Sequence, residues 1–471
     1  MFYIAKRYFR GHSVCEFHIS TIENKFKAMT EENKPKLLAG DEALDLWRRG
    51  RKAWNNWIEE NPGTDISFAG VDFSNEPDFR GELSFAAYNF GDSDVNFCRA
   101  TFGDGNVNFS RATFGDGDVN FSRATFGDGD VNFSRATFGD GNVSFRWATF
   151  GDGNVNFSRA TFGDGNVSFR CATFGDGNVN FSSTTLNTGK VTFYKTSFGD
   201  CFIDLGHAKF SSLIVRPKSL RLGKIRAEGL SVESLAIFDF PLGSENLRSM
   251  NFLGSAFGGP LYLKGKFGII PDLRVLKSSH QIELSGLKVK LHRSWKSLSW
   301  PPKLSRVSTD REDGSRLRRL KEIAETNKDH QAALRFSADE NRARRWIETS
   351  WFGSVLDMTF SACSNYGQSI LRPFAALSLL AAFSVGLYKK LAAATFTAWW
   401  TDPGWGQSLL LSISNSLPFL PQSRDLRTDA LKALYPGDPG FWVDALMITQ
   451  GVLSFVFLFL IGLGLRNRFR L

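Results

Sequence analysis

Two series of charged side chains recur every twelve residues between positions 97 and 200. One is the arginine of the phrase VNFSR, and the other is the aspartate of the phrase GDG. Because equivalent residues of a repeat protein line up along one side of it, the spacing predicts separate columns of arginine and aspartate. Such columns could bind a charged partner, or they could serve only solubility and the geometry of corners. The candidate interaction surface consists of Arg99, Arg111, Arg123, Arg135, Arg159, Asp116, Asp128 and Asp140.

Other chemistry has little support in the chain. The phrase GDGN resembles the calcium loops of other β-helices, but those loops need a nine-residue period and the period here is twelve. The chain has six histidines and five cysteines, with no CxxC pair, HExxH motif, P-loop or Ser/His/Asp motif. We therefore expect no enzyme activity, no catalytic residues, no metal and no cofactor.

Phenylalanine sets the period of the repeat. From Phe97 to Phe174 it recurs at alternating spacings of five and seven residues, with Val or Ala two positions before each ring. This is the period-two pattern of a half-buried strand, whereas two glycines in every twelve residues oppose a helix. The pattern predicts a solenoid of short stacked strands, in which corner glycines supply positive φ and corner Asp or Asn residues bond their own backbone. The rings expected to form an inner ladder include Phe109, Phe114, Phe121, Phe126, Phe133 and Phe138.

The five-residue groups VNFSR and ATFGD resemble the repeats of the pentapeptide-repeat family in its Phe-rich variant. The resemblance covers residues 65 to about 210 and implies an all-β solenoid, a right-handed quadrilateral β-helix with four five-residue faces per coil. This chain has two extra residues at every second corner, so that two of its twelve-residue units would form one coil. Some members of the family imitate the DNA duplex, but residues 97 to 200 carry ten Asp against seven Arg and two Lys. A nearly neutral surface is a poor copy of a phosphate backbone, so nucleic acid is not the expected partner.

The stretch before the repeats predicts a capping helix. Asp41 to Gly63 places Leu44, Trp47, Trp54 and Trp57 at helical spacing, with Asp41 as the N-cap. Such a helix would cover the open first coil of the solenoid. We expect a helical cap over residues 1–63, a β-helix over 64–290 (regular from 97 to 200, degenerate from 201 to 290) and no signal peptide at the N-terminus.

The last third predicts helices and a membrane hairpin. Residues 291–368 read as an amphipathic helical juxtamembrane segment, and residues 369–471 contain two apolar stretches long enough to cross a bilayer. Between these stretches, residues 406–421 are apolar but too short to span, as in a re-entrant or interfacial segment. This tail resembles the membrane tail of other bacterial pentapeptide-repeat proteins. Asp444 and Asn415 are the polar candidates of the membrane region.

The basic residues around the two spans predict the topology. Arg372 precedes the first span, and Arg466, Arg468 and Arg470 follow the second, which places both ends in the cytoplasm at the inner (plasma) membrane. The pair Lys389 and Lys390 lies on the opposite side and is a contrary signal. The net charge of +9 is therefore attributed to membrane flanks rather than to nucleic-acid binding.

Together these patterns predict a membrane-anchored protein whose cytoplasmic β-helix is a scaffold for protein interactions. The expected partners are the lipid bilayer, an unidentified protein and a further copy of the chain. The alternative is a channel-like or pore-forming effector with the β-helix as sensor or oligomerisation arm. A third reading is a soluble protein whose C-terminal region is a buried apolar core.

Overall fold

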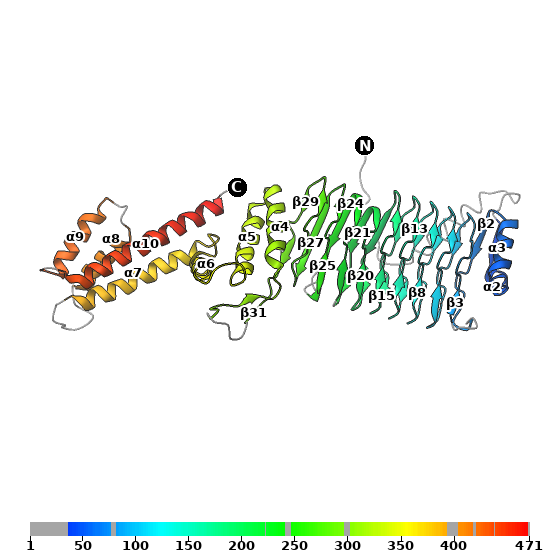
Figure 1. The fold of residues 1–471 in the computed structure, drawn as a ribbon, viewed down its shortest axis with the longest axis horizontal. Helices are drawn as coiled ribbons and strands as arrows, with labels where there is room; N and C mark the ends of the chain where they lie inside the picture. The colour runs from blue at the N-terminus through cyan, green and yellow to red at the C-terminus, as the bar shows by residue number, and fades with distance from the viewer. Residues whose placement is uncertain are drawn as a thin grey trace, which may run out of the picture. The chain divides into compact units, whose positions relative to one another are not determined.

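The fold is described from a computed structural model. It describes residues 36–76, 82–221, 223–240, 246–295, 302–392, 404–417, 421–437 and 439–469. The chain forms two compact units (Figure 1). The first consists of the described residues up to Phe267 together with Val275–Lys288, and the second of Gly268–Arg274 and the described residues from Val289 onward. Residues 1–35 of the expected N-terminal cap, and Arg470, lie outside the described residues.

The first unit is a parallel β-solenoid of about ten turns. Its strands pair in register with the equivalent strands two repeat units further on, as Val119 does with Val143 and Phe114 with Phe138. In the regular region each turn contributes two segments of Val followed by Asn or Ser and two Thr-Phe segments, which give the solenoid four faces. The turn length expected from the double unit is confirmed.

The described strands of the solenoid fall into three sheets. The eight-stranded sheet contains β3 (Glu82–Ser84), β5 (Asn106–Asn108), β8 (Val131–Asn132), β12 (Val155–Asn156), β16 (Val179–Asn180), β20 (Phe202–Asp204), β23 (Lys224–Arg226) and β25 (Ser249–Asn251). The four-stranded sheet contains β11 (Thr149–Phe150), β15 (Thr173–Phe174), β19 (Ser197–Phe198) and β22 (Ser219–Leu220). The eighteen-stranded sheet contains β1 (Lys36–Ala39), β2 (Thr64–Ser67), β4 (Val95–Asn96), β6 (Thr113–Phe114), β7 (Val119–Asn120), β9 (Thr137–Phe138), β10 (Val143–Ser144), β13 (Thr161–Phe162), β14 (Val167–Ser168), β17 (Thr185–Leu186), β18 (Lys190–Tyr194), β21 (Lys209–Arg216), β24 (Ser231–Asp239), β26 (Ala256–Phe257), β27 (Leu261–Phe267), β28 (Lys277–Ser278), β29 (Ile282–Glu283) and β30 (Leu287–Val289).

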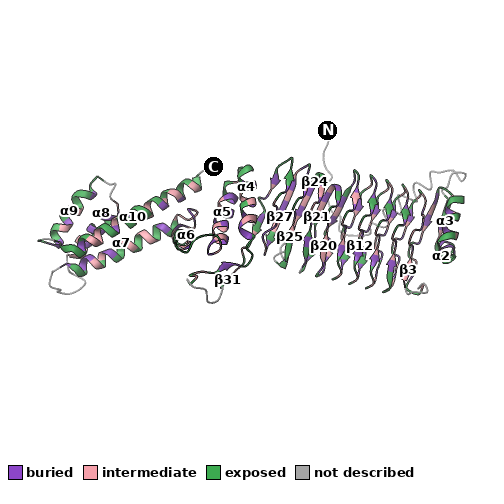
Figure 2. Cartoon of the chain, viewed as in Figure 1, coloured by how far each residue is buried: buried purple, intermediate pink, exposed green. Residues whose placement is uncertain are grey.

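Phenylalanine fills the interior of the solenoid. Alternate residues of each strand point inward, and Figure 2 shows the resulting buried positions recurring from turn to turn. The Phe133 ring stacks on Phe109 at a centroid distance of 4.8 Å and on Phe157 at 4.9 Å, with interplanar angles of 2° and 1°. It also meets Phe145 edge to face at 5.6 Å. Each ring therefore gains from both the stacked and the T-shaped geometries that aromatic pairs prefer.

The corner glycines serve a different purpose from the one expected. Gly115 and Gly129 do not adopt positive φ. A Cβ atom at Gly129 would lie 2.2 Å from the carbonyl oxygen of Gly105, one turn earlier, where ordinary contact is 3.4 to 4 Å. Glycine is needed at these corners because the backbones of successive turns approach too closely for any side chain. The prediction of positive φ was wrong here, since spacing alone does not distinguish the two uses of glycine.

The corner Asp and Asn side chains also bond differently from the expectation. The Asp116 carboxylate accepts from the Asp140 backbone N–H at 3.2 Å, and the Asp118 carboxylate from the Asn142 N–H at 2.7 Å. Both donors lie one turn later, so these side chains link successive turns. Local bonding belongs instead to the strand asparagines, for example Asn108, whose side-chain oxygen accepts from the Ser110 N–H at 2.8 Å.

Among the described residues from Lys36 onward, two helices, not one, precede the repeats. They are α2 (Gly40–Arg48) and α3 (Arg51–Glu60), separated by Gly50 at a φ of 86°. Asp41 lies inside α2 rather than at its N-cap, which is Ala39. The buried Trp54 ring packs on Phe68 and Phe90 at 5.8 and 5.6 Å, and its Nε1 donates to the Asn89 carbonyl oxygen at 2.8 Å. The helices thus cover the first inner rings of the solenoid.

The second unit is mainly helical. Its elements are β31 (Arg293–Ser294), β32 (Val307–Ser308), α4 (Asp313–Thr326), α5 (His330–Arg344), α6 (Trp351–Ser364), α7 (Leu371–Leu391), α8 (Gly404–Ser416), α9 (Ser423–Leu434) and α10 (Gly440–Phe469). Helices α7 and α10 are long and apolar enough to cross a membrane. Only 28% of the apolar 18-residue stretch of α7, and 17% of that of α10, is buried. The short segment between them forms α8, and a second helix, α9, follows that the sequence pattern did not predict.

Candidate functional site

The repeated arginines lie on two different edges of the solenoid. Each turn is built from two repeat units, so successive units alternate between edges. We call the row Arg111, Arg135 and Arg159 the arginine edge. The other row contains Arg99 and Arg123 and continues with Trp147, Cys171 and Lys195; we call it the mixed edge.

The arginines of these edges have an unusual backbone conformation. Arg111, Arg135 and Arg159 have φ values of 57°, 58° and 57°. Each is the third residue of a tight turn, closed in the first case by the Ala112 N–H donating to the Phe109 carbonyl oxygen at 3.1 Å. Turns of this kind normally place glycine at the third position, and an L-residue there costs about 1 kcal/mol. The turn fixes the direction in which each arginine side chain leaves the backbone, and all three side chains are exposed.

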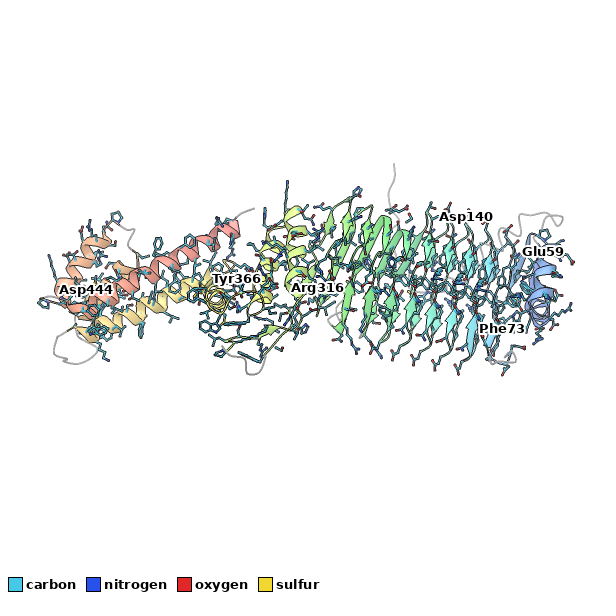
Figure 3. All side chains as sticks on the ribbon, viewed as in Figure 1. Glu59, Phe73, Asp140, Arg316, Tyr366 and Asp444 are labelled. Atoms are coloured by element: carbon cyan, nitrogen blue, oxygen red, sulfur yellow. The ribbon has the colours of Figure 1, made fainter. Side chains whose placement is uncertain are left out.

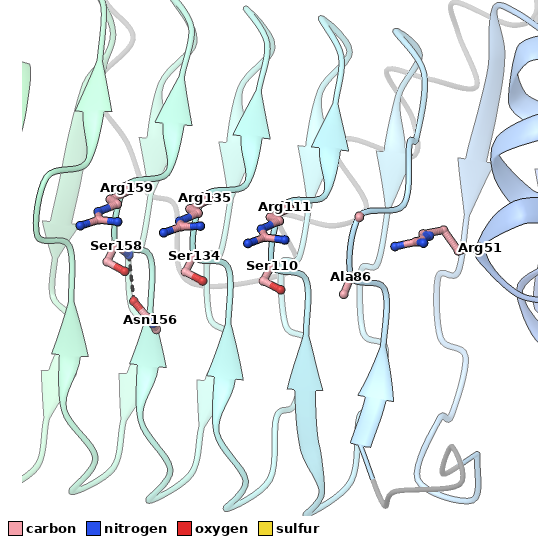
Figure 4. A pocket seen from close by; sticks show the side chains of 10 residues that line it. Arg51, Ala86, Ser110, Arg111, Ser134, Arg135, Asn156, Ser158 and Arg159 are labelled. Atoms are coloured by element: carbon pink, nitrogen blue, oxygen red, sulfur yellow. Dashed lines mark hydrogen bonds between the residues drawn. The ribbon is translucent and has the colours of Figure 1, made fainter.

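A groove runs along the arginine edge (Figure 4). It encloses about 380 Å³ and is lined by the three arginines, by Ser110, Ser134 and Ser158, and by Arg51 of α3. Arg51 lies in line with the row in Figure 4, and the turn before that of Arg111 has Ala87, without a long side chain, at the equivalent position. Among the described residues, these four guanidinium groups have no ion-pair or hydrogen-bond partner. The groove therefore presents uncompensated positive charge beside hydroxyl groups, a combination that binds anions.

The repeated aspartates occupy the other two edges. One row contains Asp104, Asp128, Asp152 and Asp176, and the other contains Asp92, Asp116, Asp140 and Asp164. Asp140 of the second row is labelled in Figure 3. All eight side chains are exposed. Five of the carboxylates accept a hydrogen bond from the backbone N–H of the residue one turn later: Asp116, Asp128, Asp140, Asp152 and Asp176. The arginine edge and the mixed edge alternate around the turn with the two aspartate edges, so each face has an aspartate edge on one border and the arginine or mixed edge on the other.

A second candidate site lies among the apolar helices. The Gln450 amide of α10 accepts from the Tyr388 hydroxyl at 2.7 Å and donates to the Ser412 and Ser416 hydroxyls at 2.8 and 2.9 Å. Asn415 donates to the Met447 carbonyl oxygen at 2.9 Å and to the Gln450 Oε1 at 3.2 Å. We call Tyr388, Ser412, Asn415, Ser416 and Gln450 the polar cluster. All five side chains are buried.

Of the two polar residues predicted for the membrane region, Asn415 belongs to the polar cluster. Asp444 is exposed on α10 and is no part of it (Figure 3). Neither Tyr388 nor Gln450 was singled out from the sequence. A glutamine in the middle of a predicted span was the available signal, because such a group needs partners in an apolar setting.

The second unit also contains an ionic cluster. Asp272 is buried and receives hydrogen bonds from Arg274 at 2.8 and 3.0 Å, and Arg316 lies 3.5 Å away. Burial alone would raise the pKa of Asp272, but the hydrogen bonds and charges of the two arginines outweigh it and hold this pKa below its usual range. The cluster is structural, because it fixes the segment Gly268–Arg274 to α4.

No family model, curated protein or solved structure matches this chain. The arginine edge, the aspartate edges and the polar cluster are therefore the features from which a function can be inferred. Among the described residues, no group of three or more His, Cys, Asp or Glu side chains is placed to hold a metal ion.

Proposed function

We propose that this chain is a bacterial, membrane-anchored pentapeptide-repeat protein whose β-solenoid is a scaffold for protein interactions. The 24-residue turns built from VNFSR and ATFGD support the family assignment. In this proposal the solenoid is right-handed and lies in the cytoplasm, as does the C-terminus. The two apolar helices α7 and α10 anchor the protein in the inner membrane.

The observation that carries the scaffold function is the arginine edge. Its guanidinium groups are exposed and have no partner among the described residues, and tight turns on stacked strands fix where their side chains start. Binding groups held on rigid elements lose little entropy on association. A row of this kind suits a partner with a complementary row of charge better than it suits catalysis.

The membrane anchor is supported by the apolar surface of the two long helices. Phe383 of α7 is 67% exposed and Phe455 of α10 is 68% exposed. Large continuous apolar surfaces are rare on soluble proteins, and a bilayer would cover these residues. Membrane sedimentation of the full chain tests this part, with pelleting expected even in high salt. Recovery in the supernatant would refute the anchor and favour the soluble alternative.

Cysteine labelling tests the orientation. Cys98 and Cys171 lie on the solenoid and are partly exposed. A membrane-impermeant thiol reagent should leave both unlabelled in intact cells and label them after the membrane is opened. Labelling of either cysteine in intact cells would overturn the cytoplasmic assignment.

The polar cluster favours a second candidate function, ion conduction by the helical region. Buried polar side chains within apolar helices often mark ion pathways. This candidate predicts ion flux in liposomes containing the full chain and loss of that flux on Gln450→Leu. The matched control is Thr449→Leu, because Thr449 is the neighbouring residue but is exposed. Absence of flux from the wild-type chain would leave anchoring as the function of these helices.

A further inference from the structure

One face of the solenoid has opposite charges on its two borders. This face is formed by β5, β8, β12 and β16, and its outward side chains are strand asparagines. Along the chain, the aspartate row Asp104, Asp128, Asp152 and Asp176 precedes these strands, and the arginine edge follows the first three of them. We call this surface the charged face. Its centre is neutral, so its binding preference is set by its two borders.

The two borders of the charged face have the same period. Arg111, Arg135 and Arg159 are one turn apart, and so are Asp104, Asp128 and Asp152. Successive turns of a solenoid are about 4.8 Å apart. Neither row has an ion-pair partner among the described residues of the chain. Like charges at this spacing repel one another, so each row is stabilised by opposite charges that repeat at the same distance.

We propose that the charged face binds the charged face of a second copy of this chain, in a parallel dimer. A two-fold axis parallel to the solenoid axis places the arginine edge of each copy against the aspartate border of the other. Such an interface is closed and self-complementary. Without axial shift, Arg111 meets Asp104, Arg135 meets Asp128 and Arg159 meets Asp152 of the partner copy.

The dimer rests on the proposed membrane anchor in one respect. Two chains that run in the same direction can insert their C-terminal helices into one bilayer. Confinement to the bilayer also raises the effective concentration of the partner. Exposed ion pairs are individually weak, so this interface gains from tethering and is expected to weaken with salt.

Other anions fit the arginine edge less well. An extended acidic peptide presents carboxylates on one side about 6.7 Å apart, and B-DNA presents one phosphate per strand about every 3.4 Å. Neither spacing matches that of the arginine edge, which has one arginine about every 4.8 Å, so the charges of such a ligand would not stay opposite the arginines over several turns. The aspartate border of a second solenoid matches the row at every turn.

Charge reversal in the full chain tests the dimer. The assay is sedimentation velocity of the detergent-solubilised protein at several salt concentrations. Wild-type protein should dimerise, more strongly at low salt. Arg135→Asp with Arg159→Asp should weaken dimerisation about tenfold or more, and aspartate tolerates the left-handed turn position. The matched control, Arg99→Asp with Arg123→Asp on the mixed edge, should dimerise as the wild type does.

Mixing variants provides the sharper test. Asp128→Lys with Asp152→Lys should also fail to self-associate. Its mixture with the arginine-edge variant should form a heterodimer, because both borders are then complementary again. If the lysine variant does not fold, Asp128→Asn with Asp152→Asn keeps the side-chain acceptor, and dimerisation should still weaken.

Three results would overturn the proposal: a monomeric wild-type chain at low salt, an arginine-edge variant that dimerises normally, or a folded pair of variants that does not recombine. Binding of single-stranded DNA or of an acidic peptide to a monomeric chain would instead assign the groove to a free polyanion. All variants should still pellet with membranes, so failure of the dimer is distinguishable from failure of the anchor.

Discussion

Replacing Gly129 with alanine tests why the corners of the solenoid contain glycine. The added Cβ atom would lie 2.2 Å from the Gly105 carbonyl oxygen, so the two turns must separate locally by about 1 Å to reach an ordinary contact. Separation stretches two hydrogen bonds that join the turns. These are Asp130 N–H to Asn106 Oδ1 and Val107 N–H to the Asp130 carbonyl oxygen, both 2.8 Å.

The expected cost follows from these contacts. Overpacking typically costs about 1 to 3 kcal/mol, and each weakened hydrogen bond adds about 1 kcal/mol. Alanine recovers less than about 1 kcal/mol by restricting the unfolded chain. We therefore expect Gly129→Ala to lower the free energy of unfolding of the solenoid by about 3 kcal/mol.

Two control variants separate close approach from backbone conformation. Gly254 has a φ of 70° and open space around it, so Gly254→Ala should cost only about 1 kcal/mol. Arg135 has positive φ but is not glycine, and Arg135→Gly should change stability by less than about 0.5 kcal/mol, because relief of strain and loss of chain stiffness cancel.

Urea unfolding of the full chain, followed by near-ultraviolet circular dichroism of the stacked rings, measures all three variants. Hydrogen exchange of the turns on either side of Gly129 locates the damage. A Gly129→Ala protein within about 1 kcal/mol of the wild type would refute the close-approach argument. A Gly254→Ala protein that is the less stable of the two would show that conformation, not contact, governs these glycines.

Two further changes test other parts of the fold. Phe133→Leu should destabilise the solenoid by about 2 kcal/mol, because two stacked ring pairs are lost; an equal loss on Asn132→Ala, an outward neighbour, would contradict the role of stacking. Asp272→Asn should cost about 2 kcal/mol at neutral pH by weakening its bonds to Arg274. The folded pKa of Asp272 is lowered, so this stabilisation is complete above the usual aspartate pKa and is lost as pH falls through the folded pKa. Thermal unfolding of wild type and variant should therefore converge in acid, and a constant difference at all pH values would exclude the ionic mechanism.

Much of the solenoid could be predicted because its signals are local. The alternation of Val or Ala with Phe identifies inward positions, and the resemblance to pentapeptide repeats, with four faces per coil, implies a turn made of two repeat units. The use of each corner residue could not be predicted in the same way. Whether Gly129 needs positive φ or needs space depends on the neighbouring turn, and Arg135 gives no sign in the sequence that it occupies a left-handed turn position.

The helical region shows the same limit. The two long apolar helices follow from composition, whereas α6 and α9 have short or mixed patterns that did not stand out. The polar cluster joins Gln450 to Tyr388 and Asn415, which precede it by 62 and 35 residues along the chain. No local sequence pattern predicts contacts between residues so far apart along the chain. The splitting of the arginines into two rows required only the turn length, and the resulting alternation of charged edges is what makes a dimer testable.

The bond from each corner side chain to the following turn makes the solenoid extendable in whole steps. Asp118 holds the backbone N–H of Asn142, so a finished turn already presents the acceptor that the next turn needs. If residues 119–142 were deleted, Asp118 would be joined to Val143 and every remaining turn would meet an equivalent neighbour. The distance between groups at the two ends of the solenoid could thus be reset in increments of about 4.8 Å. The length of the repeat region is therefore set by the number of 24-residue turns that the gene encodes.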